Sequence, residues 1–261
     1  MKKRIAFVTN PMIVGGVERA LIALLNEIDY SRYEVVLWTK SIGGDFEKQI
    51  NPNVKIHSWN TGNSRKRLTE ALKNGRLAEA TTGLYYRYML RTTGRDWVIN
   101  EYYEAKAQEI CDDKPYDAVI AYQGLYSGVI ATALYRLCSP VKIAWIHGEH
   151  SFSQEQMNFL TKEYEKVNHL FCVSESIRKQ FCLSFPDIYS KTSVFYNIID
   201  VQEIRGRSLE KTDDTMTKTS LLTVGRISKP KGQILIPKAT RILLDGKYDI
   251  YWYLVGDGEM G

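Results

Sequence analysis

The feature that most constrains the fold of this chain is an alternation of short β-rich runs with longer amphipathic runs. Eight runs rich in Val, Ile, Phe, Tyr and Trp are candidate strands, namely 4–9, 33–38, 117–122, 141–147, 169–174, 193–197, 220–225 and 249–256. Several contain successive apolar residues without strict alternation, which is typical of strands covered on both faces. The pattern therefore predicts an α/β fold, with an open parallel sheet and helices on both of its faces.

Three of the intervening runs have the pattern of helices. Between 17 and 28, apolar residues recur at the spacing of one helix face: Val17, Ala20, Leu21, Leu24, Leu25 and Ile28. The segments 151–166 and 176–185 are also predicted helices, each opened by a serine that can cap it. The uncharged stretch 118–135 has polar residues and glycines at its centre, so we expect a strand, a turn and a helix there rather than a membrane span.

A polar stretch without periodicity, 206–220, predicts a linker between two domains, 1–205 and 221–261. The second of these contains one strand–helix–strand unit, which leaves its sheet poorly covered, so we expect an incomplete domain. Pro237 would disrupt a helix that begins at Gly232, and it is compatible with a helix that begins near Ile236.

Charge is concentrated in one region of the chain. The whole chain carries 35 basic and 30 acidic residues, whereas 62–95 has two acidic residues and these eight basic ones: Arg65, Lys66, Arg67, Lys73, Arg76, Arg87, Arg91 and Arg95. The stretch is either a solvated helical face or a patch that attracts an anionic membrane or a lipid-linked acceptor. Nucleic acid is not an expected partner, because no recognition module is present. Four cysteines without a C-x-x-C pair suit a cytoplasmic protein, to which the patch would add peripheral attachment at the inner face of the plasma membrane.

Two motifs of the first domain carry candidate binding chemistry. Gly15 and Gly16 stand where a loop enters a predicted helix, and such a position allows close backbone approach and attracts an anion. A plain tight turn is the alternative interpretation. His147, at the end of a strand, could bind a sugar hydroxyl or move a proton. No metal site is expected, because His147, Glu149 and His150 are crowded within one turn and lack a fourth ligand.

The second domain contains two further motifs. In TVGRISKPKG, Arg226 and Lys231 lie on the loop that leaves a strand, where two cations can converge on a diphosphate. In LVGDGE, the turn Gly256-Asp257-Gly258 offers exposed backbone for a nucleoside. Each motif alone is also compatible with an ordinary solvated loop, and their combination favours a ligand site.

In their order along the chain, the segments GGVER, WIHGEH, FCVSES, VFYNIID, TVGRISKPKG and YLVGDGE resemble the retaining glycosyltransferases of family 4. The resemblance implies a GT-B fold, here a complete N-terminal Rossmann-like domain and the first βαβ unit of a second one. It also implies sugar transfer from a nucleotide donor to a saccharide acceptor, possible membrane association and a role in surface polysaccharide synthesis. Neither a metal ion nor another cofactor is implied.

The resemblance also implies roles for single residues. Arg226 and Lys231 would hold the donor diphosphate, and His147 would contact the donor sugar. Gly15 and Gly16 would lie against the donor phosphate and the acceptor. The turn at 256–258 would receive the nucleoside.

The second domain lacks the family's Glu-x7-Glu segment within these residues, so we expect a C-terminally truncated hexosyltransferase that transfers sugar poorly by itself. A module that only binds an acceptor or a membrane is the alternative hypothesis. The sugar, the nucleotide and the acceptor are left open by the sequence.

Overall fold

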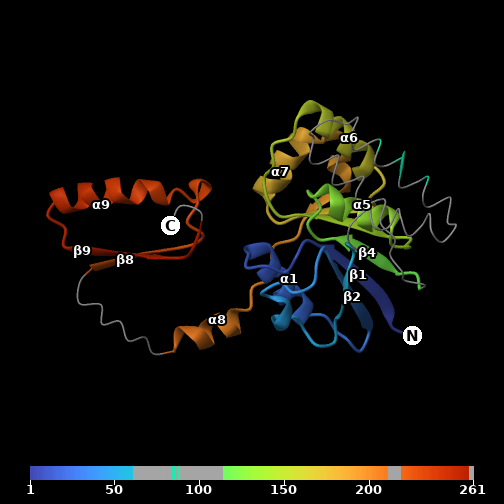
Figure 1. Ribbon diagram of the computed structural model, residues 1–261, viewed down its shortest axis with the longest axis horizontal. Coiled ribbons are helices and arrows are strands. Elements are labelled where there is room, and N and C mark those ends of the chain that lie inside the picture. Colours follow the sequence, from blue (N-terminus) through green and yellow to red (C-terminus); the bar gives the residue numbers. More distant parts are fainter. Residues whose placement is uncertain (61–80, 82–83, 86–87, 89–113, 211–218, 259–261) are drawn as a thin grey trace. The chain divides into compact units, whose positions relative to one another are not determined.

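The computed structural model of the protein describes residues 1–60, 81, 84–85, 88, 114–210 and 219–258. The chain divides into two units, Met1–Asp200 and Val201–Gly261 (Figure 1). Each unit has its own parallel sheet.

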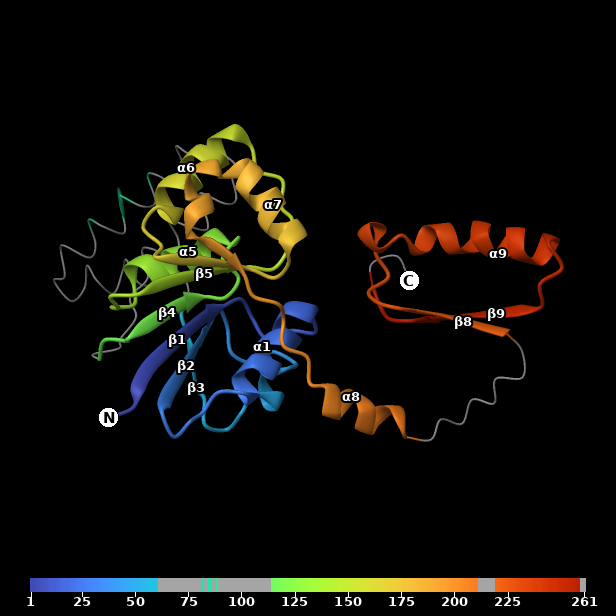
Figure 2. The ribbon, with the colours of Figure 1, turned by 180° about the vertical axis from the view of Figure 1, so that it is seen from behind.

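Seven parallel strands form the sheet of the first unit, in the order β3-β2-β1-β4-β5-β6-β7. They are β1 (Lys3–Thr9), β2 (Tyr33–Thr39), β3 (Lys55–Ser58), β4 (Ala118–Ala121), β5 (Lys142–Ile146), β6 (His169–Cys172) and β7 (Thr192–Val194). Figure 2 shows the run of β3, β2, β1, β4 and β5 across the sheet. The strand order reverses between β1 and β4, as in Rossmann-like folds. The predicted α/β fold with an open parallel sheet is confirmed, and β3 is a strand that the sequence analysis missed.

Helices of the first unit connect these strands: α1 (Gly16–Asn26), α5 (Ser127–Tyr135), α6 (Gln154–Tyr164) and α7 (Glu175–Ser184). The predicted capping serines were wrong by a few positions. Ser153 caps α6 in a capping box with Gln156, and Ser174 caps α7 by accepting from the backbone N–H of Ile177. A serine followed three residues later by glutamine can satisfy two free N–H groups at once, and both Ser151 and Ser153 have such a glutamine, so this motif alone does not choose between them.

Two apolar clusters lie on the two faces of this sheet. Phe7 belongs to one cluster and Val8 to the other, so successive residues of β1 are buried on opposite sides. Leu21 and Leu25 of α1 join the cluster of Phe7, whereas Tyr164 of α6 joins the cluster of Val8. This double burial explains why the strands have continuous apolar runs.

The second unit contains α8 (Val201–Ser208), β8 (Thr219–Val224), α9 (Ile236–Asp245) and β9 (Ile250–Val255). Helix α9 begins at Ile236 with Pro237 in its first turn, as predicted, because the ring of a proline is tolerated where no N–H is needed. The predicted linker 206–220 needs correction at both ends, since α8 extends to Ser208 and β8 begins at Thr219. Residues 211–218 lie outside the described residues.

The strands β8 and β9 pair in parallel, with Val224 opposite Val255. Figure 1 shows α9 along one side of this pair. Large apolar side chains on the sheet are exposed, namely Leu222, Val224, Tyr251, Leu254 and Val255. No helix among the described residues is long and apolar enough to cross a membrane. The stretch 118–135 is the strand β4, a turn and the helix α5, as expected.

Candidate functional site

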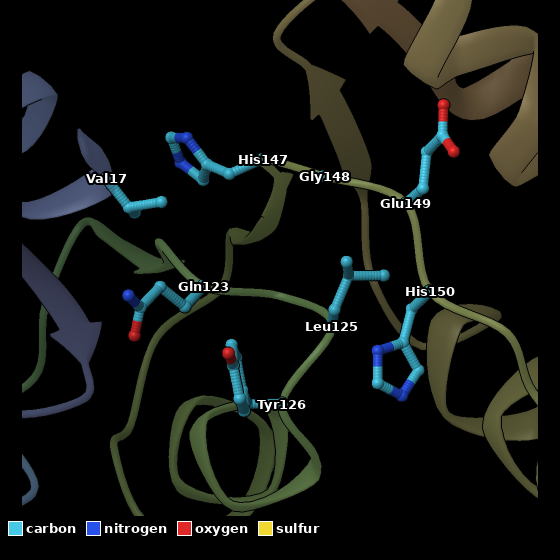
Figure 3. A pocket seen from close by; sticks show the side chains of 8 residues that line it. All are labelled: Val17, Gln123, Leu125, Tyr126, His147, Gly148, Glu149 and His150. Carbon is cyan, nitrogen blue, oxygen red and sulfur yellow. The ribbon is translucent and has the colours of Figure 1, made fainter. Parts of the chain in front are cut away.

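A pocket of about 160 Å³ opens at the carboxyl edge of the first sheet. Eight residues line it: Val17, Gln123, Leu125, Tyr126, His147, Gly148, Glu149 and His150. Val17 comes from α1, and the others follow β4 and β5 (Figure 3). The pocket therefore lies beside the point at which the strand order reverses, where open α/β sheets bind ligands. The expectation that His147 and the start of α1 meet at one edge is confirmed.

His147 is held in this pocket by aromatic neighbours. Its ring centroid lies 4.4 Å from that of Tyr122 and 5.9 Å from that of Trp145, and the planes of His147 and Trp145 are nearly parallel. Both ring nitrogens of His147 are buried, and among the described residues neither makes a hydrogen bond of ordinary geometry, although the backbone carbonyl of Tyr122 interacts with the ring. The pocket therefore contains a polar ring with hydrogen-bonding capacity left for a ligand.

Burial lowers the pKa of His147 to about 4, and the backbone carbonyl of Tyr122 opposes this shift only in part. The imidazole is consequently neutral at pH 7, so that one ring nitrogen is a donor and the other an acceptor. A neutral ring of this kind suits a ligand hydroxyl, which can both donate and accept. It is poorly suited to pairing with a phosphate.

Gln123 and Glu18 form a buried polar pair next to the pocket, and the sequence analysis assigned neither to a site. Nε2 of Gln123 donates to Oε1 of Glu18 at 2.8 Å, and the backbone N–H of Asn10 donates to Oε1 of Gln123 at 2.9 Å. Both Gln123 and Glu18 are about 7% exposed. Gln123 could have been predicted as a site residue from one feature of the sequence, because it is a polar residue directly after the predicted apolar strand 117–122.

The two glycines at the start of α1 have different neighbours. A Cβ atom on Gly15 would lie 2.2 Å from Oε2 of Glu18, whereas a Cβ on Gly16 would meet nothing within 4 Å. The Glu18 carboxylate therefore occupies the space beside Gly15 and would have to move if position 15 carried a side chain, and the N-terminus of α1 stabilises its charge. The contact of Gly15 and Gly16 with a donor phosphate stays a prediction.

The two motifs of the second unit lie against each other. The backbone N–H of Gly225 donates to the carbonyl of Val255, and that of Ile227 donates to the carbonyl of Asp257, each at 2.9 Å. Cβ atoms on Gly256 and Gly258 would lie 2.0 and 2.1 Å from carbonyl oxygens of the facing loop. Glycine is thus required at both positions, because the loop that carries Arg226 packs directly on the turn.

Arg226 and Lys231 are both exposed on this loop. Neither side chain has an ion-pair partner within the described ranges. The loop itself is fixed, because Nε2 of Gln233 donates to the Arg226 carbonyl at 2.8 Å. Gly232, with φ of 73°, ends the short 3-10 turn that contains Lys231. The arrangement presents two permanent cations beside exposed backbone at one sheet edge, which is chemistry suited to a diphosphate.

Two further predictions from the sequence concern the basic stretch and the absence of a metal site. The basic residues Arg65, Lys66, Arg67, Lys73, Arg76, Arg87, Arg91 and Arg95 lie outside the described residues, so their proposed patch stays a prediction. Figure 3 shows the Glu149 carboxylate pointing away from the His150 ring. Among the residues that the structure describes, no group of three or more His, Cys, Asp or Glu could hold a metal ion.

Comparison with known proteins finds similarity in three dimensions only. No family profile and no curated protein sequence matches the chain. Among solved structures, HepE from Anabaena, crystallised with UDP and glucose, is 17% identical with a TM-score of 0.57 over 98% of this chain and 62% of its own. A glycosyltransferase from Rickettsia africae is 14% identical, with a TM-score of 0.57 over 98% of this chain and 61% of its own.

A mutant of TarM from S. aureus, crystallised with fondaparinux, alpha-GlcNAc-glycerol and UDP, is 10% identical with a TM-score of 0.55 over 99% of this chain and 73% of its own. The chain thus spans about 62% and 61% of the lengths of HepE and the rickettsial protein. At these identities the likeness concerns the fold alone. It confirms the α/β, GT-B-like architecture that the sequence predicts.

Proposed function

We propose that this protein is a glycosyltransferase that moves a sugar from a nucleotide-diphosphate donor to a saccharide acceptor. The observation that carries the proposal is the packing of the Arg226 loop on the turn at 256–258, where β8 and β9 end. Arg226 and Lys231 there are exposed and without ion-pair partners in the described ranges, so both are available to a diphosphate. The likeness of the fold to proteins crystallised with UDP supports the same conclusion.

The chemistry follows from the charges of this loop. When the bond between sugar and phosphate breaks, negative charge grows on the departing diphosphate and the sugar acquires oxocarbenium character. Arg226 and Lys231 would stabilise that growing charge from fixed positions, without needing a metal ion. Removing one such group typically lowers a rate by about 100- to 1000-fold.

The pocket of the first unit would receive a sugar. His147 is neutral at pH 7 because burial lowers its pKa to about 4, so it can exchange hydrogen bonds with a hydroxyl and carries no charge to pair with a phosphate. From the resemblance of the motifs, we further propose a hexosyl donor, retention of configuration, a lipid-linked saccharide acceptor and a role in surface polysaccharide synthesis. The same resemblance supports a cytoplasmic protein at the inner face of the plasma membrane.

Donor binding tests the proposal directly, and it does not depend on turnover. Titration calorimetry should show that UDP-sugars bind, and that Arg226→Ala and Lys231→Ala each weaken the binding about tenfold or more, since each removes a charge-assisted hydrogen bond. Lys238→Ala is the matched control, because Lys238 is an exposed cation of the same unit, on α9. Unchanged affinity in the Arg226 and Lys231 variants would exclude the diphosphate assignment.

A further inference from the structure

The amide orientation of Gln123 is determined by its two neighbours. The Asn10 N–H can only donate, so the Gln123 atom that it contacts at 2.9 Å must be Oε1. Carboxylate oxygens accept hydrogen bonds, so the Gln123 atom at 2.8 Å from Oε1 of Glu18 must be Nε2. Rotation of the amide by half a turn would break both bonds at once. Gln123 therefore has one allowed orientation.

The paired Glu18 and Gln123 leave one hydrogen-bonding group unused. Nε2 carries two N–H groups, and Glu18 accepts from one of them. The part of the chain that the structure describes provides no partner for the second. Gln123 also lines the pocket that His147 lines, so the residue that carries the unused donor and a neutral imidazole border the same cavity. A buried polar group without a partner costs free energy, and a ligand oxygen would recover it.

Glu18 is chemically part of this cluster as well. Its negative charge adds to burial in raising the pKa of Tyr122, whose ring lies against that of His147. The carboxylate can occupy this place because Gly15 has no side chain. A single chain of contacts therefore leads from Gly15 through Glu18 to Gln123.

We propose that Gln123 determines sugar specificity in this pocket by donating its free amide N–H to an oxygen of a bound pyranose, and that Glu18 is the residue that positions it. The inference rests on the proposed function, because it assumes that the pocket binds a sugar. The pocket volume of about 160 Å³ suits one small polar ligand, and it is well below the volume of sites for larger ligands. The pyranose could be the sugar of the donor or that of the acceptor.

Three probes distinguish these two sources: UDP alone, UDP-glucose and methyl α-glucoside, with UDP-galactose and UDP-N-acetylglucosamine as further donors. Gln123→Met keeps the length of the side chain and removes the donor. We expect it to weaken the binding of UDP-sugars or of the glucoside about three- to tenfold, and to leave the binding of UDP unchanged. A loss with UDP-sugars alone identifies the donor sugar, and a loss with the glucoside alone identifies the acceptor. Either loss supports the inference.

Two substitutions of Glu18 separate positioning from simple stability. Glu18→Gln keeps an oxygen that accepts from Nε2 of Gln123, so its sugar affinity should stay within about twofold of the wild-type value. Glu18→Leu removes the acceptor and should reproduce the loss seen in Gln123→Met. Gln154→Met is the matched control, because Gln154 is an exposed glutamine on α6. Circular dichroism and thermal unfolding identify any variant that fails to fold, and if Glu18→Leu is such a variant, Gln123→Met carries the comparison against the wild type and Gln154→Met.

The outcomes also separate this inference from the proposed function. If the wild-type protein binds UDP and UDP-sugars, but Gln123→Met and Glu18→Leu bind every probe as the wild type does, the role of Gln123 is excluded and the proposed function stands. If the wild-type protein binds none of the probes at millimolar concentration, both proposals fail.

Discussion

The hydroxyl group of Tyr164, on α6, donates a hydrogen bond of 2.9 Å to the carbonyl of Gly124, in the loop that follows β4. Tyr164 is fully buried, and Gly124 is closely packed on β5, because a Cβ there would lie 3.0 Å from the Cβ of Ala144. The loop that carries the pocket residues Gln123 to Tyr126 is thus attached to a helix on one side and to a strand on the other.

Tyr164→Phe should therefore destabilise the protein. It leaves the Gly124 carbonyl buried without its partner, which costs about 1 to 2 kcal/mol in the free energy of unfolding. Urea denaturation followed by tryptophan fluorescence measures this difference. Tyr196→Phe is the control, because Tyr196 is 67% exposed, and its free energy of unfolding should change by less than about 0.5 kcal/mol. Equal values for the two variants would show that the hydrogen bond is unimportant.

Gly15→Ala and Gly16→Ala should have different effects although the positions are adjacent. Alanine at position 15 would displace the Glu18 carboxylate and break its bond to Gln123, which should cost about 1 to 3 kcal/mol because the acceptor is charged. At position 16, the first residue of α1, alanine meets open space and favours the helix. Thermal and denaturant unfolding of the two variants checks this difference, and a Gly15→Ala protein as stable as the wild type would contradict it.

The stability of the protein should fall between pH 6.5 and pH 4 because of His147. Its pKa is about 4 in the folded state and about 6.5 when unfolded, so the unfolded chain binds more protons in this range. The contribution of the buried, neutral His147 ring to the free energy of unfolding is fully present above pH 6.5 and is lost as the pH approaches 4. Between pH 7 and 4.5, the wild-type protein should lose about 2 kcal/mol more than His147→Gln, which has no titrating ring. Parallel pH profiles for the two proteins would show that burial of the ring has no such effect.

Gly256→Ala should disturb the loop of Arg226. The new Cβ would lie 2.0 Å from the carbonyl oxygen of Gly225, and the φ of 153° at Gly256 is itself unfavourable for alanine. The N–H groups of Gly225 and Ile227 should then lose their protection against hydrogen exchange, because their acceptors on the facing strand end move away. Nuclear magnetic resonance follows this exchange directly.

Gly206→Ala is the matched control for this measurement, because Gly206 lies in α8 and a Cβ there would meet nothing within 4 Å. Its exchange rates at Gly225 and Ile227 should equal those of the wild-type protein. The prediction fails if both variants retain full protection.

The alternation of strands and helices, the direction of the sheet and the start of α9 at Ile236 could all be predicted from the sequence. These features depend on residues close together in the chain: the apolar period of a strand or helix, and the fixed φ of Pro237. The sequence also placed His147 and the start of α1 at one edge, because the carboxyl ends of parallel strands share an edge. The short strand β3 was missed, since Lys55–Ser58 offers only four residues and one apolar side chain.

Only the tertiary structure decided which polar groups meet. Glu18 and Gln123 are 105 positions apart, and no local pattern pairs them. Their contact requires that β1 and β4 be neighbours and that Gly15 leave space for a carboxylate. The lowered pKa of His147 depends in the same way on the aromatic rings that pack around it. Sequence periodicity determines the elements, because it is local, whereas the strand order determines the site, because it brings distant residues together.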